Sequence, residues 1–267
     1  MRPVTEIGRA VHAEWTKLRT LQSTPWLLLL TAGSMITMSL AVTGTLRLPD
    51  DCTTPCFEDT VKLSLLGVRL GQAGVVILAV LAVTAEYGTR TIKPTLTAMP
   101  RRWAVLIGKL GVVTGLALAA GVVGTAGSVL VAHATLPGRG FTPANGYPAI
   151  PLLDDLTRRA CVGTVLYLGL VALLSAGVAL LVRDTGGALT VVLALLFASP
   201  LLAQFVSDTR WQHRIHRFSP MDAGLAIQAT RDFATIHIGQ WAGVGLLAAY
   251  AAGAALVGGL AFRLRDA

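Results

Sequence analysis

Six long apolar runs, separated by shorter polar segments, dominate the pattern along the chain. Each run is close to or above the roughly 20 residues that an α-helix needs to cross a bilayer. The pattern therefore predicts an all-α membrane protein in which residues 25–267 form one six-span transmembrane domain. The expected spans are residues 25–46, 63–85, 104–136, 160–182, 187–206 and 240–262.

The residues before the first span, 1–24, have a second pattern, in which apolar side chains recur at steps of three and four. These side chains are Val4, Ile7, Val11, Trp15 and Leu18. Basic residues occupy the other faces, so the segment is predicted to be an amphipathic helix lying in the cytoplasmic membrane interface. Trp15, Lys17 and Arg19 would anchor it at the headgroups. The alternative is an ordinary soluble helical tail.

The segment between the second and third spans reads "EYGTRTIKPTLTAMPRRW", residues 86–103. Its apolar residues Ile92, Leu96, Met99 and Trp103 follow steps of four, three and four. Pro94 suits the first turn of a helix, and Pro100 would end it. We expect a short amphipathic helix here, although a plain basic loop fits these residues equally well. The anchors of the following span would be Arg101, Arg102 and Trp103.

The composition agrees with a membrane protein, because 54% of the residues are hydrophobic and only 13% are charged. A soluble domain carries about 25% charged residues. The first apolar run starts at Pro25, is too long for a signal-peptide core and lacks a small-x-small cleavage site, so we expect it to remain as an anchor. The net charge of +8 indicates retention at a membrane; no nucleic-acid partner is expected.

The orientation is predicted from lysine and arginine in the short segments near span ends. Residues 1–24 and 86–103 are both basic, which places both termini in the cytoplasm. The long segment 207–239 also carries arginines, but long loops cross the membrane regardless of charge. Because loops of this length rarely lack structure of their own, we expect short helices on the outer face before the last span.

Two of the three cysteines, Cys52 and Cys56, lie in the first external loop, "DCTTPCFED". On the oxidising side of the membrane a small disulfide between them is plausible. Two free thiols are equally compatible, because close spacing does not guarantee the geometry of the bond.

Motifs for chemistry are scarce in this chain. It has no H-E-x-x-H zinc motif and no G-x-x-x-x-G-K-[ST] phosphate loop, so no metal, cofactor or enzymatic activity is expected. Arg69 and Lys109 are the clear charges within spans, and both lie near span ends, where long side chains can extend to the interface. No series of acidic residues crosses the spans, so a transport function would need energy from a partner. An intramembrane hydrolase centred on Ser175 is a minor alternative.

Three stretches give the chain a resemblance to a known family. "VHAEWTKLRTLQSTPW" (11–26), "EYGTRTIKPTLTAMPRRWAVLIGKL" (86–110) and "FSPMDAGLAIQA" (218–229) are similar to segments of the permease subunit of bacterial type-2 ATP-binding-cassette (ABC) exporters. The resemblance covers the chain and its six spans in order. It implies a multi-pass protein of the bacterial plasma membrane that exports a hydrophobic or amphipathic compound.

The resemblance also assigns partners and residues. A second permease and a separate ABC ATPase, which binds the ATP, would complete the exporter. The residues that would couple to the ATPase are Glu86, Tyr87, Gly88, Thr89, Arg90, Thr91 and Ile92. The alternative function is a membrane scaffold or sensor anchor that transports nothing.

Three G-x-x-x-G pairs are candidates for close helix contacts: Gly67/Gly71, Gly111/Gly115 and Gly239/Gly243. Such pairs let two helix backbones approach each other within a membrane. Each pair could serve a contact within one subunit or a contact between two copies.

Overall fold

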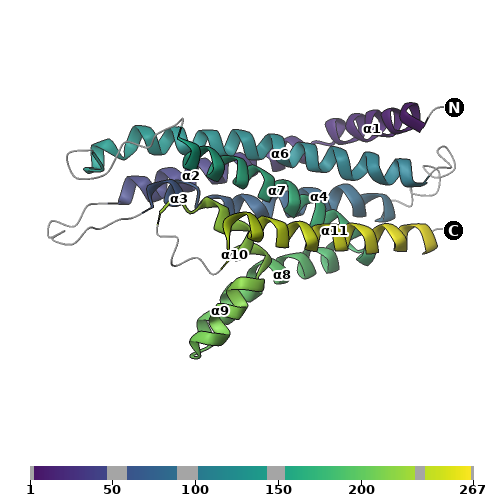
Figure 1. Ribbon diagram of the computed structural model, residues 1–267. Helices are drawn as coiled ribbons and strands as arrows, with labels where there is room; N and C mark the ends of the chain where they lie inside the picture. The colour runs from purple at the N-terminus through teal and green to yellow at the C-terminus, as the bar shows by residue number, and fades with distance from the viewer. Residues whose placement is uncertain (1–2, 47–58, 89–101, 143–153, 232–237, 266–267) are drawn as a thin grey trace.

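The long helices run side by side in a bundle in the computed structural model, which describes residues 3–46, 59–88, 102–142, 154–231 and 238–265 (Figure 1). Six of them are long and apolar enough to cross a membrane, and no strand occurs in those ranges. The six are α2 (Ser23–Thr45), α4 (Val68–Gly88), α6 (Arg102–Thr135), α7 (Asp155–Val182), α8 (Thr185–Phe205) and α11 (Gln240–Arg265). An all-α multi-pass membrane protein is therefore confirmed.

The second span differs from its predicted bounds of 63–85. The chain first forms α3 (Thr60–Ser64), breaks at Leu65, and then forms α4, which continues to Gly88. Gly67 lies at this break, directly against the backbone of Met35 in α2, where a side chain would not fit. The sequence placed Glu86 in a polar loop, but the structure places it in the last turn of a membrane helix.

The N-terminal helix α1 (Pro3–Thr20) packs along α6 through a face that the apolar stripe only partly predicted. Among residues 6–20 of this helix, whose burial the structure describes, Ala10, Glu14 and Leu18 are buried, at steps of four. Ala10 lies so close to Gly108 that a Cβ on that glycine would meet the Ala10 Cβ at 3.0 Å. Trp15, from the predicted stripe, remains exposed.

Helix α7 forms the centre of the bundle and contacts α4, α6, α8 and α11. Its Tyr167 is fully buried, and the hydroxyl donates to Oε1 of Gln72 in α4, whose Nε2 in turn donates to Sδ of Met221 at 3.2 Å. A buried polar group requires such partners, because no water is at hand to replace them. This contact therefore ties α4 to α7 inside the apolar core.

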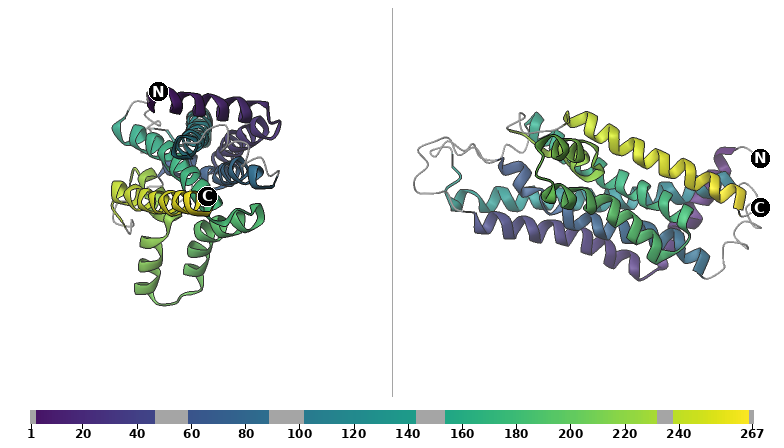
Figure 2. Two further views of the ribbon diagram at one scale, coloured as in Figure 1. Left: turned by 90° about the vertical axis from the view of Figure 1, so that its right-hand side faces the viewer. Right: turned by 90° about the horizontal axis from the view of Figure 1, so that it is seen from below.

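The two ends of the bundle carry different elements. Both termini lie at one end, together with the turn between α7 and α8 (Figure 1). The short helices lie towards the other end: α3, η1 (Pro137–Arg139), α9 (Thr209–Phe218), α10 (Pro220–Leu225) and η3 (Ala226–Gln228). Helix α9 projects from the side of the bundle (Figures 1 and 2).

Asp59 joins two distant segments at the end opposite the termini. Its carboxylate caps α3 by accepting from the Lys62 backbone N–H at 3.0 Å. The same carboxylate accepts from the backbone and hydroxyl of Thr230 at 2.5 and 2.7 Å and from the Arg231 backbone at 3.0 Å. A single side chain thus fixes the start of the α3–α4 segment to the chain that follows η3.

Replacing Asp59 with alanine removes all four hydrogen bonds, and we expect a loss of at least about 2 kcal/mol of unfolding free energy, because bonds to a charged group are the stronger ones. Asp184→Ala is the control, since Asp184 is exposed and caps α8 through one bond to the Gly187 backbone. It should cost about 1 kcal/mol. Thermal unfolding in detergent measures both, and equal losses would contradict this account of Asp59.

The glycine pairs have different surroundings. Gly67, Gly71 and Gly243 lie against other helices of the same chain, whereas Gly111 and Gly115 have open space beside them. A close contact of α7 with α11 uses a glycine outside these pairs. A Cβ on Gly177 would meet the carbonyl carbon of Ala254 at 2.5 Å.

Gly177→Ala should therefore lower the free energy of unfolding by about 1 to 3 kcal/mol, through overpacking of the α7–α11 contact. The matched control is Gly253→Ala in α11, where a Cβ would have open space. There alanine should be neutral or stabilise by up to about 1 kcal/mol, because it favours the helix more than glycine does. Effects of the same sign at both sites, again by unfolding in detergent, would refute the close contact.

Candidate functional site: an ion-paired cluster at the end of α4

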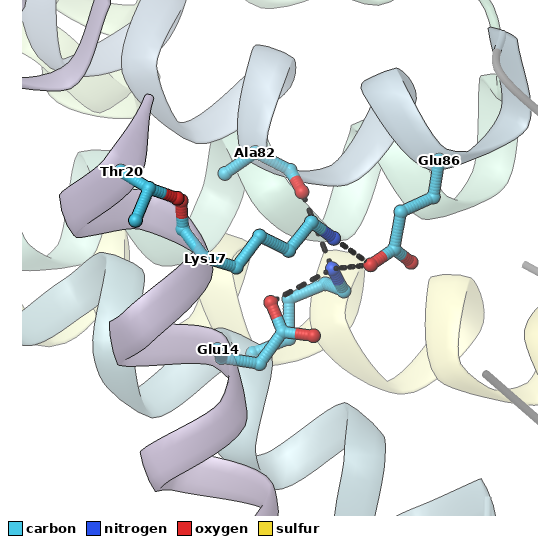
Figure 3. Close-up of polar contacts among 6 residues, drawn as sticks. Glu14, Lys17, Thr20, Ala82 and Glu86 are labelled. Carbon is cyan, nitrogen blue, oxygen red and sulfur yellow. Dashed lines mark hydrogen bonds and ion pairs between the residues drawn. The ribbon is translucent and has the colours of Figure 1, made fainter. Parts of the chain in front are cut away.

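The end of α4 collects contacts from three other helices, α1, α6 and α8, and from the α7–α8 turn. Glu86 points from it towards α1 and α6 (Figure 3). Tyr87 and Thr84, on other sides of the same turn, meet the α7–α8 turn and α8. We call Glu14, Lys17, Glu86 and Lys109 the ion-paired cluster.

Glu86 is the centre of this cluster. It is only 2% exposed, and its Oε1 lies 2.9 Å from Nζ of Lys109 in α6. Lys17 of α1 donates to the same oxygen. The second oxygen, Oε2, is buried and has no hydrogen-bond partner among the residues described. One carboxylate therefore joins three helices.

Lys109 does not extend to the membrane interface as its position near a span end suggested. It is 3% exposed and donates to Oε2 of Glu14 at 3.1 Å and to the Ala82 carbonyl at 3.2 Å. With Glu86 as a third partner, its ammonium has all three donors directed at oxygen atoms. The reason is that Glu14 and Glu86 approach Lys109 from two other helices. Their carboxylates compensate the buried ammonium, so the side chain does not need to extend to water.

The charges of the ion-paired cluster balance, with two carboxylates and two ammonium groups. Burying charge without a partner is very costly, so the three helices must stay together for the four groups to be compensated. Lys17 is the most accessible member, at 35% exposure of its side chain. The other three are enclosed by protein.

The rest of the α4 turn is held by weaker contacts. The guanidinium of Arg183 lies over the Tyr87 ring, 5.2 Å from its centroid, and donates to the Ala261 carbonyl of α11 at 3.1 Å. Arg183 ends α7 in the left-handed conformation, with φ of 63°. The hydroxyls of Thr84 and Thr185 lie 2.8 Å apart and join α4 to the start of α8. Helices α1, α6 and α8 therefore contact this end of α4 through polar groups of their own. Helices α7 and α11 are connected to it through Arg183.

Other predicted residues have these positions. Gly88 ends α4 and is exposed; Trp15 and Arg19 are exposed on α1, and Trp103 is half-buried in the first turn of α6. Arg102 begins α6. Cys52, Cys56, Thr89, Arg90, Thr91, Ile92 and Arg101 lie outside the described residues.

Ser175 and His216, two side chains of types that can carry catalysis or bind metal, are both occupied by hydrogen bonds within the protein. Ser175 is buried, and its hydroxyl donates to the Val171 carbonyl one turn earlier in α7 at 2.6 Å. His216 shares a hydrogen bond with Asp222 at 2.8 Å. Within the described ranges, no group of three or more His, Cys, Asp or Glu could hold a metal ion.

Comparison of the chain with protein-family models and with curated proteins gives no match. The class of protein is therefore assigned from the sequence and the structure of this chain. Six helices with the length and composition of membrane spans define a multi-pass, all-α membrane protein.

Sequence reasoning missed Glu14 and the pairing of Lys109. A usable signal existed, since a lysine inside an apolar run is rare and is usually paired within a bundle. The partner was harder to find, because Glu14 is separated from Lys109 by 95 positions and lies on a helix that was predicted to lie in the membrane interface.

Lys109→Met should lower the unfolding free energy by about 3 to 5 kcal/mol, because Glu14 and Glu86 lose a shared buried partner. Lys62→Met is the control: Lys62 is an exposed lysine of α3, and its loss should change stability by less than about 0.5 kcal/mol. Adding Glu14→Gln to Lys109→Met should recover part of the loss by removing one of the two uncompensated carboxylates. Failure of this recovery in detergent unfolding would argue against the charge balance.

Proposed function

We propose that this chain is the permease subunit of an ATP-driven exporter in the bacterial plasma membrane. It would move a hydrophobic or amphipathic compound outwards with energy from a separate ABC ATPase. A second permease, identical or related, completes the assembly. Both termini face the cytoplasm in this proposal, and the basic segments 1–24 and 86–103 support that side.

The observation that carries the proposal is the ion-paired cluster. It includes Glu86, the first residue of the segment 86–92 that resembles the coupling element of type-2 permeases. A force applied to this segment reaches Glu86 within a few residues. Because Glu86 is bound to both Lys17 and Lys109, the force is passed to α1 and α6 as well as to α4.

The proposal changes the role of one coupling residue. Glu86 is buried by its own chain, so it acts as a positioning residue that fixes the start of the coupling segment. The residues proposed to contact the ATPase are then those that follow Tyr87: Gly88, Thr89, Arg90, Thr91 and Ile92. The helix α1 remains the proposed interfacial element, supported by the exposure of Trp15 and Arg19.

A second permease would need a face that the chain does not already use. Gly67, Gly71 and Gly243 support contacts within the chain, so they are poor candidates. Gly111 and Gly115 of α6 are exposed with open space beside them, which supports this pair as a close-approach point.

The test is co-expression with an ABC ATPase from the same genome, starting with any that is encoded beside this chain, followed by gentle purification. We expect the ATPase to co-purify and vesicles containing both proteins to move an amphipathic dye such as rhodamine 6G on addition of ATP. Lys17→Met should slow dye movement per ATP hydrolysed about ten-fold or more, because α1 is released from Glu86. The protein should still fold, since Lys109 continues to pair Glu86.

Arg19→Gln is the matched control, because Arg19 is exposed on the same helix. It should leave the ratio of transport to hydrolysis unchanged. Absence of any bound ATPase would overturn the proposal and favour a scaffold or sensor anchor. Equal ratios in Lys17→Met and the unmodified protein would show that the ion-paired cluster is purely structural.

A further inference from the structure

Helix α9 is the most basic element at the end of the bundle opposite the termini. Its sequence, "TRWQHRIHRF", contains Arg210, Arg214 and Arg217 and no acidic residue. All three arginines are exposed. The nearest acidic side chains in sequence are engaged: Asp208 caps α9 through the Arg210 backbone at 2.8 Å, and Asp222 binds His216.

The same helix carries an apolar stripe. Trp211, Ile215 and Phe218 recur at steps of four and three, whereas the arginines lie beside this stripe or opposite it. Trp211 and Phe218 are more than half exposed. The guanidinium of Arg214 lies 5.3 Å from the Trp211 ring centroid, at the border of the two faces. A helix of this composition suits the boundary between acyl chains and headgroups.

The placement of α9 agrees with that boundary. It lies across the direction of the long helices and projects beyond their outline, with the end of α8 beside it (Figure 2). Leu201, Leu202 and Phe205 of α8 are exposed next to it, Phe205 at 84%. Because α8 is a membrane span, its exposed apolar end places the stripe of α9 close to acyl chains and the arginines close to phosphates.

We propose that α9 is a binding surface for the headgroups of anionic phospholipids in the leaflet at this end of the bundle. Arginine matches phosphate in charge and in its planar array of donors. A basic residue near an anionic membrane surface contributes about a five-fold preference. Three arginines on one short helix therefore give a preference of at least about ten-fold for anionic over zwitterionic lipid, after allowance for screening by salt. This inference does not depend on the proposed transport function.

The experiment uses the full chain in a neutral detergent, titrated with phosphatidylglycerol or with phosphatidylcholine of the same acyl chains. Native mass spectrometry measures the lipid bound. Phosphatidylglycerol should bind about ten-fold more tightly, and high salt should reduce this preference. The triple variant Arg210→Gln/Arg214→Gln/Arg217→Gln should lose most of it.

The matched control removes three exposed basic residues from the same end of the bundle but outside α9: Lys62→Gln, Arg139→Gln and Arg158→Gln. It should keep most of the preference. The triple variant Arg210→Lys/Arg214→Lys/Arg217→Lys keeps the charge and should also retain binding, so it tests the proposal even where Arg210→Gln/Arg214→Gln/Arg217→Gln folds poorly.

Three results would overturn the inference. One is equal affinity of the unmodified chain for the two lipids. Another is an equal loss of the preference for phosphatidylglycerol in the α9 triple variant and the control triple variant, which would show that the preference depends on the total charge of the protein. The third is an α9 triple that keeps its lipid preference but loses a dimer, which would assign the surface to a second copy of the chain.

Discussion

Three buried charges and one half-buried charge must be compensated at one end of this bundle, and the arrangement of its helices there depends on that requirement. Glu86 and Lys109 lie on two helices that are long and apolar enough to cross a membrane. Glu14 and Lys17 bring α1 into the same contact, although α1 is not among the spans. Separating any of these helices would leave a charge without a partner in a medium that solvates it poorly.

The opposite end is held by neutral polar groups and by one carboxylate on its surface. Tyr167 and Gln72 join α4 to α7 in the core, and Asp59 fastens the chain after η3 to α3. Between the two ends, small residues such as Gly177 allow helix backbones to meet directly. A bundle tied in this way can transmit a displacement along α4, because the helix is bonded to its neighbours near both ends.

The arginines of α9 illustrate how a charge pattern acquires meaning from its location. In the sequence they counted against the predicted orientation and were discounted because the segment is long. In the structure they form one exposed face of a helix that also carries an apolar stripe next to the end of a span. Their proposed partner is then a lipid headgroup at the membrane surface, which is a different function from setting topology.

The sequence alone determined the class of protein and most span positions, because hydrophobic length depends only on local composition. The end of α6 and the turn before α8 lie within two residues of prediction. The break at Gly67, the buried face of α1 and the pairing of Lys109 were decided by tertiary structure. Each depends on a partner far away in the chain: Met35 against Gly67, Gly108 against Ala10, and Glu14 with Glu86 around Lys109. A charge in an apolar run shows that a partner is needed, but only the packing of three helices determines which residue it is.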